Sequence, residues 1–182
     1  MSLAHAILGL LLRQEMTGYD LKTSCFSQTI AHFWPADQAQ IYRTLDKLEQ
    51  QGWISCTVEI QHDRPNRKVY RVTEAGKAEL VRWLGCPQPL PTVRDPLLIQ
   101  MFFAARVLPL DAIIHLLEQQ QATRRQKLAE CEAIELPPLG NASASREQMM
   151  QRLVLELVIR QEQTYIDWLD MAIEVIRHQT PS

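Results

Sequence analysis

The chain has 182 residues, of which 46% are hydrophobic and 22% are charged, and its formal net charge is −2 at pH 7. These values fit a globular protein and exclude a polycation, so any binding to nucleic acid needs a local basic surface. The four cysteines, at positions 25, 56, 86 and 131, are widely spaced and form no Cys-x-x-Cys pair, which argues against a disulfide framework and a zinc site.

The chain opens with an apolar segment, which we interpret as a buried helix over residues 2–13. No positively charged stretch precedes Ala4–Leu12, no small-residue cleavage site follows it, and it is too short to cross a bilayer. We therefore expect no secretion signal and no membrane anchor, and a soluble, cytoplasmic protein.

A second helix is predicted from Thr17, a residue that is typical of helix N-caps, to Phe33. Pro35 follows two residues later and is expected to break the chain there, because proline removes a backbone donor and fixes its own backbone angle. These signals predict one continuous helix over 17–33.

A third helix is predicted to begin after Asp37 and to end near Gly52. Asp37 and Gln40 have the spacing of a capping box, in which each side chain bonds the other residue's backbone amide. The apolar residues of this helix recur at intervals of four and three, which is the inner face of an amphipathic helix: Ile41, Leu45 and Leu48.

The sequence then changes to the two-residue period of β-strands. Thr57–Ile60 alternates polar and apolar residues, Gln61–Asn66 is a polar turn, and Val69–Val72 is the predicted return strand. Thr73 is expected to cap a helix through Leu84. Three helices followed by a hairpin and another helix is the order of a winged helix-turn-helix.

A proline-rich connector follows this first domain. Cys86–Thr92 contains three prolines in alternate positions, which favours an extended chain. We therefore predict a domain over 1–85, a connector over 86–92 and a second, helical domain over 93–182. The balance of Lys plus Arg over Asp plus Glu is 10 − 9 = +1 before the connector and 9 − 12 = −3 after it, which favours the first domain for contact with a polyanion.

The second domain reads as three helices. The first starts after Asp95 and Pro96 and covers 97–107, since proline at the first helical position loses no needed donor. The second runs over 111–135 and is followed by a loop at 137–141. Ser145 and Gln148 fit a capping box for a third helix that reaches about His178, roughly 50 Å long at 1.5 Å per residue.

This last helix carries two apolar stripes, and each needs a surface to pack on. One stripe, interrupted by Glu162, consists of Leu155, Val158, Tyr165, Leu169, Ala172 and Ile176. The other consists of Met150, Leu153, Leu157, Trp168 and Met171. We expect one stripe to pack on the chain itself and the other on a second copy, which predicts a homodimer; a monomeric bundle is the alternative.

The outer side of the third helix and the hairpin tip carry the residues expected to meet DNA. Glutamine can bond adenine through two hydrogen bonds, arginine can bond guanine or phosphate, and tyrosine and lysine suit phosphate contacts. A basic wing tip can straddle the backbone. The candidate DNA-binding residues are Gln38, Gln40, Tyr42, Arg43, Lys47, Arg64, Arg67 and Lys68.

Six short motifs follow one another between Leu3 and Leu84: Ala6-Ile-Leu-Gly-Leu-Leu, Thr17-Gly-Tyr-Asp-Leu, Gln40-Ile-Tyr-Arg-Thr-Leu-Asp-Lys-Leu-Glu, Gly52-Trp-Ile, Arg64-Pro-Asn-Arg-Lys-Val-Tyr and Thr73-Glu-Ala-Gly. With these motifs in this order, the chain resembles the PadR family of transcriptional regulators over Leu3–Leu84. The resemblance implies a homodimer, usually a repressor, that binds an inverted-repeat operator on double-stranded DNA. It also implies a small, often aromatic effector that relieves DNA binding.

Aromatic residues of the second domain are the candidates for effector binding, since flat apolar ligands stack on such rings. They are Phe102, Phe103 and Trp168. Packing within the dimer interface is the competing interpretation of these side chains.

No motif points to catalysis or to a cofactor: we find no glycine-rich phosphate loop, no nucleophile elbow and no His-Glu-x-x-His. An enzyme is therefore not expected. A winged-helix module that binds protein rather than DNA remains the alternative, because the first domain carries a charge of only +1.

Overall fold

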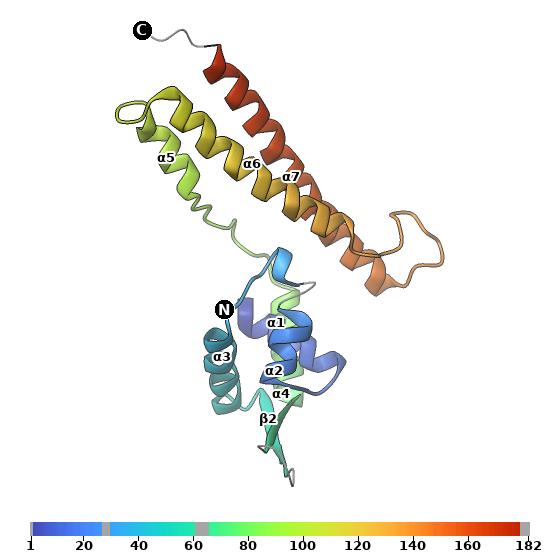
Figure 1. Ribbon diagram of the computed structural model, residues 1–182. Coiled ribbons are helices and arrows are strands. Elements are labelled where there is room, and N and C mark those ends of the chain that lie inside the picture. The colour runs from blue at the N-terminus through green and yellow to red at the C-terminus, as the bar shows by residue number, and fades with distance from the viewer. Residues whose placement is uncertain (1, 27–29, 61–65, 179–182) are drawn as a thin grey trace. The chain divides into compact units, whose positions relative to one another are not determined.

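The computed structural model describes the whole chain except residues 1, 27–29, 61–65 and 179–182. The chain divides into two compact units, Met1–Leu90 and Pro91–Ser182, and the division falls inside the proline-rich stretch 86–92. Figure 1 shows both units; each is described by itself.

The N-terminal unit combines helices with a small antiparallel sheet. Its main helices are α1 (Ser2–Arg13), α3 (Gln38–Gln50) and α4 (Glu74–Leu84), and its strands are β1 (Met16–Thr17), β2 (Ile54–Glu59) and β3 (Arg67–Val72). The strand order is β1-β3-β2. In the register, Ile54 lies opposite Val72, and Glu59 lies opposite Arg67. The β2–β3 hairpin extends away from the helices (Figure 1).

The core of this unit confirms the predicted inner face of the third helix. Ile41, Leu45 and Leu48 are fully buried, and they pack with α1, with Tyr70 of β3 and with Leu80 of α4. Thr73 caps α4 as predicted, because its hydroxyl accepts a hydrogen bond from the amide of Gly76. The winged helix-turn-helix order is therefore confirmed, and β1 adds a third strand that is too short to show a period in the sequence.

The predicted second helix over 17–33 is wrong in its continuity. Thr17 does cap α2 (Gly18–Asp20), but the chain then widens into a π-helical turn, η1 (Leu21–Cys25), and later forms a 3₁₀ turn, η2 (Ile30–His32). The amide of Phe26 bonds the carbonyl of Leu21, five residues back. Leu21, Cys25 and Phe26 are all buried in the core along this widened turn.

The C-terminal unit consists of α5 (Pro96–Ala104), α6 (Leu110–Glu132) and α7 (Arg146–Arg177). The long helices α6 and α7 lie side by side (Figure 1). Both predicted caps are present, Asp95 on α5 and the Ser145–Gln148 capping box on α7. Helix α5 ends at Ala104, before the predicted end at 107, because a turn directs two later amides back to the Ala104 carbonyl.

Two apolar clusters hold this unit together. Around one end of the helix pair, Leu97 and Ala104 of α5 pack with Ile113, Leu117, Leu169 and Ile173. A second cluster joins Cys131, Leu155 and Val158. Within the described residues, no helix is both long enough and apolar enough to cross a membrane.

Glu162, which interrupts an apolar stripe in the sequence, is 3% exposed and lies between two cations of α6. Its Oε2 is 2.8 Å from Nη1 of Arg124, and its Oε1 is 2.7 Å from Nζ of Lys127. Burial alone would raise the pKa of Glu162, but the hydrogen bonds and charges of Lys127 and Arg124 outweigh burial and lower it. The carboxylate is therefore held ionised between its partners.

The same arginine connects this ion pair to the start of α5. Its guanidinium lies 3.8 Å from the centre of the Tyr165 ring, and the Tyr165 hydroxyl donates to Asp95, the N-cap of α5. Burial and the Asp95 carboxylate raise the pKa of Tyr165 to about 12, so this phenol stays protonated and keeps donating at neutral pH. One buried polar network thus links α5, α6 and α7.

Replacing Glu162 with Gln should lower the free energy of unfolding at pH 7 by about 1–3 kcal/mol, since Arg124 and Lys127 lose their shared carboxylate. Because the folded-state pKa of Glu162 lies below its ordinary value of 4.5, the stabilisation is complete above that value and is lost as the pH falls through the folded-state pKa. Urea unfolding at a series of pH values should therefore show the two proteins converging in acid. A pH-independent difference would contradict this account, and Glu174→Gln, on the exposed side of α7, is the control.

Candidate DNA-binding surface

Local capping fixes the start of α3. The amide of Gln40 donates to Oδ1 of Asp37 at 2.7 Å, and the amide of Asp37 donates to Oε1 of Gln40 at 3.1 Å. This capping box confirms the prediction. With the inner side of α3 buried in the core, its rotation is set and the opposite side faces solvent.

The candidate residues on α3 are all exposed: Gln38, Gln40, Tyr42, Arg43 and Lys47. The helix as a whole is not strongly basic, because Asp46 and Glu49 offset the charges of Arg43 and Lys47. The exposed side therefore offers hydrogen-bonding groups and two cations rather than a strong positive field.

The capping box limits the hydrogen bonds that the Gln40 side chain can make with a base. A two-bond contact with adenine uses both the oxygen and the nitrogen of a glutamine amide. The Gln40 oxygen already accepts from the Asp37 amide, so one of its two lone pairs is in use and the side chain is held toward the start of α3. Gln38, one residue after the cap, has no part in the capping box.

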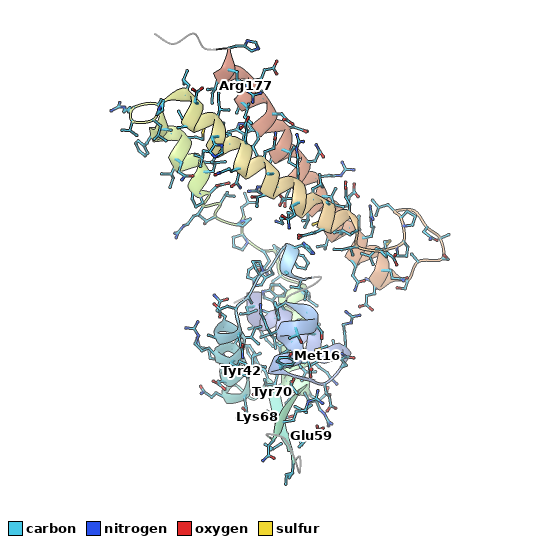
Figure 2. All side chains as sticks on the ribbon, in the orientation of Figure 1. Met16, Tyr42, Glu59, Lys68, Tyr70 and Arg177 are labelled. Atoms are coloured by element: carbon cyan, nitrogen blue, oxygen red, sulfur yellow. The ribbon has the colours of Figure 1, made fainter. Side chains whose placement is uncertain are left out.

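Tyr42 is positioned by a close approach of α2. A Cβ atom added to Gly18 would lie only 2.6 Å from Cε1 of the Tyr42 ring, so only glycine leaves room for the ring in its present position. Tyr42 is 37% exposed and lies beside the N-terminus of α2. Figure 2 shows Tyr42, Tyr70 and Lys68 following one another from α3 to the hairpin.

In the hairpin, the two candidate residues that the structure describes have different surroundings. Arg67 forms a 2.8 Å ion pair with Oδ2 of Asp20 in α2, so it ties the turn end of β3 to α2. Lys68 is exposed, lies opposite Val58, and shares its strand face with Tyr70. The third candidate of the hairpin, Arg64, lies outside the described residues.

Asp20, which sequence reasoning missed, joins the cap of α2 to the hairpin. Its carboxylate accepts from the backbone amide and the hydroxyl of Thr17 and from Arg67. Burial raises the pKa of Asp20, but these hydrogen bonds and the nearby guanidinium together lower it. The Thr17-x-x-Asp20 spacing is that of a capping box and was the signal available in the sequence.

Beside α3 lies a groove that the sequence did not indicate. One wall consists of Leu3, Phe33, Trp34 and Pro35, and the other consists of Gln40, Arg43, Thr44 and Lys47 of α3. Two candidate DNA-binding cations therefore face an apolar, aromatic wall across this groove.

The three effector candidates do not form one site within the chain. Phe102 and Phe103 contact each other edge to face, with ring centres 5.1 Å apart, and are 81% and 59% exposed. Trp168 lines a separate hollow between α5 and α7, together with Leu98, Leu157, Arg160, Gln161, Thr164 and Tyr165. Arg160 gives this second hollow a cation that the sequence analysis did not consider.

Two family models match the chain. Residues 7–82 match the transcriptional regulator PadR-like family, and residues 93–177 match a family described as the virulence activator alpha C-terminal region. The negative transcriptional regulator PadR of Bacillus subtilis (strain 168) is 34% identical over 178 residues, which are 96% of this chain and 97% of that protein.

Solved structures of the Bacillus subtilis regulator superpose over nearly the whole chain. Its complex with operator DNA has a TM-score of 0.80 at 34% identity and covers 97% of this chain and 99% of that one. Its complex with p-coumaric acid has a TM-score of 0.76 at 31% identity and covers 98% of this chain and 100% of that one.

The Arg67–Asp20 ion pair predicts that Arg67 contributes to the stability of the fold and that its neighbour Lys68 does not. Arg67→Ala should lower the free energy of unfolding by about 0.2–1 kcal/mol, the range of partly exposed ion pairs, whereas Lys68→Ala should leave it unchanged. Urea unfolding of the two variants and of Asp20→Asn measures this. Equal effects of Arg67→Ala and Lys68→Ala would show that the ion pair does not hold the hairpin.

Proposed function

Because this chain belongs to the PadR-like family of transcriptional regulators, we propose that it binds operator DNA through α3 and the β2–β3 hairpin, as a homodimer that represses transcription. A regulator of this kind works on the chromosome, so we expect it to act in the cytoplasm. The operator would be an inverted repeat, since a two-fold dimer meets two equivalent half-sites about one helical turn apart.

One observation carries this proposal: the inner side of α3 is buried and its outer side is exposed beside a protruding hairpin. A major groove admits one helix, and residues near the N-terminus of such a helix reach base edges. We assign base contacts to Gln38 and Arg43, a backbone contact to Tyr42, and phosphate contacts to Lys47 and Lys68.

Gln40 and Arg67 can contact DNA only while they keep hydrogen bonds to other residues of the chain. Gln40 would contact a base while its amide oxygen also bonds the Asp37 amide, which limits the positions that its side chain can take. Arg67 reaches a phosphate only by sharing its guanidinium with Asp20. Arg64 is assigned to the wing from the sequence alone.

The relative with known operator DNA supports this choice over a protein-binding module. Its complex covers nearly all of both chains, and it is named as a negative transcriptional regulator. The balanced charges of α3 do not require a protein partner, since base contacts by Gln38 and Arg43 depend on hydrogen bonds rather than on net charge.

A second copy of the chain would cover α7. Residues spaced by three and four form an exposed apolar stripe on the side of α7 away from α6, interrupted at Gln161 and Thr164, and two helices with such a stripe can bury them against each other. The stripe comprises Met150, Leu153, Leu157, Met171 and Val175, with the partly buried Trp168 between them. Four of these, and Trp168, belong to the second stripe expected from the sequence.

An aromatic acid is the effector class that the C-terminal unit favours. The hollow of Trp168 combines apolar and aromatic walls with one cation, Arg160, which suits a flat ligand with a carboxylate. The relative that was solved with p-coumaric acid supports this ligand class.

An aromatic acid should weaken DNA binding by the wild-type protein but not by the Trp168→Ala variant. Phe102 and Phe103 lie outside this hollow and are better explained as surface that another molecule covers.

DNA binding is tested by fluorescence anisotropy, with a duplex that the wild-type protein selects from a random-sequence library. Arg43→Ala should weaken binding by about 1–3 kcal/mol per half-site and relax sequence preference there, because it removes a base contact. Lys47→Ala should weaken binding to all duplexes and reduce the slope of log K against log salt by about 0.9 for each phosphate that is no longer neutralised. A wild-type protein that selects no duplex would refute the proposal.

The dimer is tested by placing a charge in the apolar stripe. Leu157→Glu buries a carboxylate in the interface and should convert the dimer to a monomer that no longer binds the selected duplex tightly. Sedimentation velocity measures the association state, and circular dichroism checks that the helices persist. Ala122→Glu adds the same charge to an exposed position of α6 and should remain dimeric. A wild-type monomer at micromolar concentration would contradict the dimer.

A further inference from the structure

The groove beside α3 lies on one flank of that helix. Gln40, Thr44 and Lys47 are spaced by four and three residues, so they share a flank, whereas Tyr42 projects from another part of the helix toward α2. Phe33 and Trp34 form the opposite wall and are 48% and 41% exposed. We call these two side chains the aromatic ledge. Large rings that are half exposed beside a DNA-reading helix require an explanation.

Three sets of contacts hold the aromatic ledge in place. The amides of Phe33 and Trp34 both bond the carbonyl of Ile30, at 3.2 and 2.7 Å, which closes the 3₁₀ turn under the rings. Nζ of Lys22 donates to the carbonyl of Ala36 at 3.1 Å, and the buried Ala36 leads directly to the Asp37 cap of α3. The backbone under the rings is therefore tied to η1 on one side and to α3 on the other.

The chemistry of the groove selects an occupant with an apolar face and an anionic edge. Aromatic rings line one wall, and the Arg43 and Lys47 side chains line the other. A sugar–phosphate backbone has both properties, because its deoxyribose rings are largely apolar and its phosphates are charged. A helix with its side chains is about 10–12 Å across and the major groove is about 12 Å wide, so a helix seated there meets the backbones that form the walls.

We infer that the aromatic ledge packs against the deoxyribose rings of one DNA strand, while Lys47 reaches a phosphate next to them. The DNA contact then extends beyond α3 on the flank that carries Gln40 and Lys47. This inference rests on the proposed function, since it requires α3 to lie in the major groove. It makes Trp34 and Phe33 positioning residues that set how deeply and at what angle α3 enters.

The test compares Trp34→Ala, Phe33→Ala and Lys47→Ala in the full chain, with the selected duplex and an unrelated duplex as probes. Each ledge variant should weaken binding roughly tenfold to a hundredfold, since both protomers lose apolar surface that DNA would bury. The loss should be similar on both duplexes, because sugars carry no base information. The salt slope should stay at the wild-type value for the ledge variants but fall for Lys47→Ala, because only the lysine displaces counterions.

Val81→Ala, an exposed apolar truncation on α4 away from the groove, should match the wild type. Melting curves identify a variant that fails to fold, and Phe33→Ala then carries the test in place of Trp34→Ala. Unchanged affinity of a folded ledge variant would overturn the inference, and so would a loss confined to the selected duplex, which would mean that a ring reads a base. If the wild type binds no duplex, the proposed function fails instead.

Discussion

The burial of one side of α3 is the constraint on which the DNA-binding surface depends. Ile41, Leu45 and Leu48 are completely enclosed, so the helix cannot rotate without exposing them, and each would lose about 1.5–3 kcal/mol of apolar burial. The Asp37 cap then fixes where the helix begins along its axis. Rotation and starting point together determine which side chains point outward. The exposed residues of α3 are thus specified by residues that never meet solvent.

Features that depend only on residues close together in the chain could be predicted from the sequence. The caps at Thr17, Asp37 and Ser145 and the buried side of α3 were predicted because each depends on residues three or four apart. The prediction failed at the π-helical turn at Leu21–Cys25, which no local signal in the sequence marks and which contributes Leu21, Cys25 and the following Phe26 to the core. The candidate DNA-binding residues could be named from the sequence, but the Arg67–Asp20 pair spans 47 positions and could not.

The two units use polar groups in different ways. In the N-terminal unit, carboxylates at helix starts satisfy free amides, and Asp20 in addition pairs with the hairpin. In the C-terminal unit, Glu162 is buried inside the helix pair and Arg124 links it to Tyr165. Buried ion pairs add little net stability compared with apolar packing, but they disfavour arrangements that leave a charge without its partner. The network therefore specifies how α6 and α7 align along their length.

The double role of Gln40 limits how this surface can change its target during evolution. A substitution there that offers a new base contact would also remove the hydrogen bond from the Asp37 amide to the Gln40 side chain, and leave only the Asp37 side chain to cap α3. Gln38 and Arg43 make no hydrogen bond in the capping box. New operator preferences are therefore expected to arise first at those two positions, while Gln40 stays as it is or changes only together with Asp37.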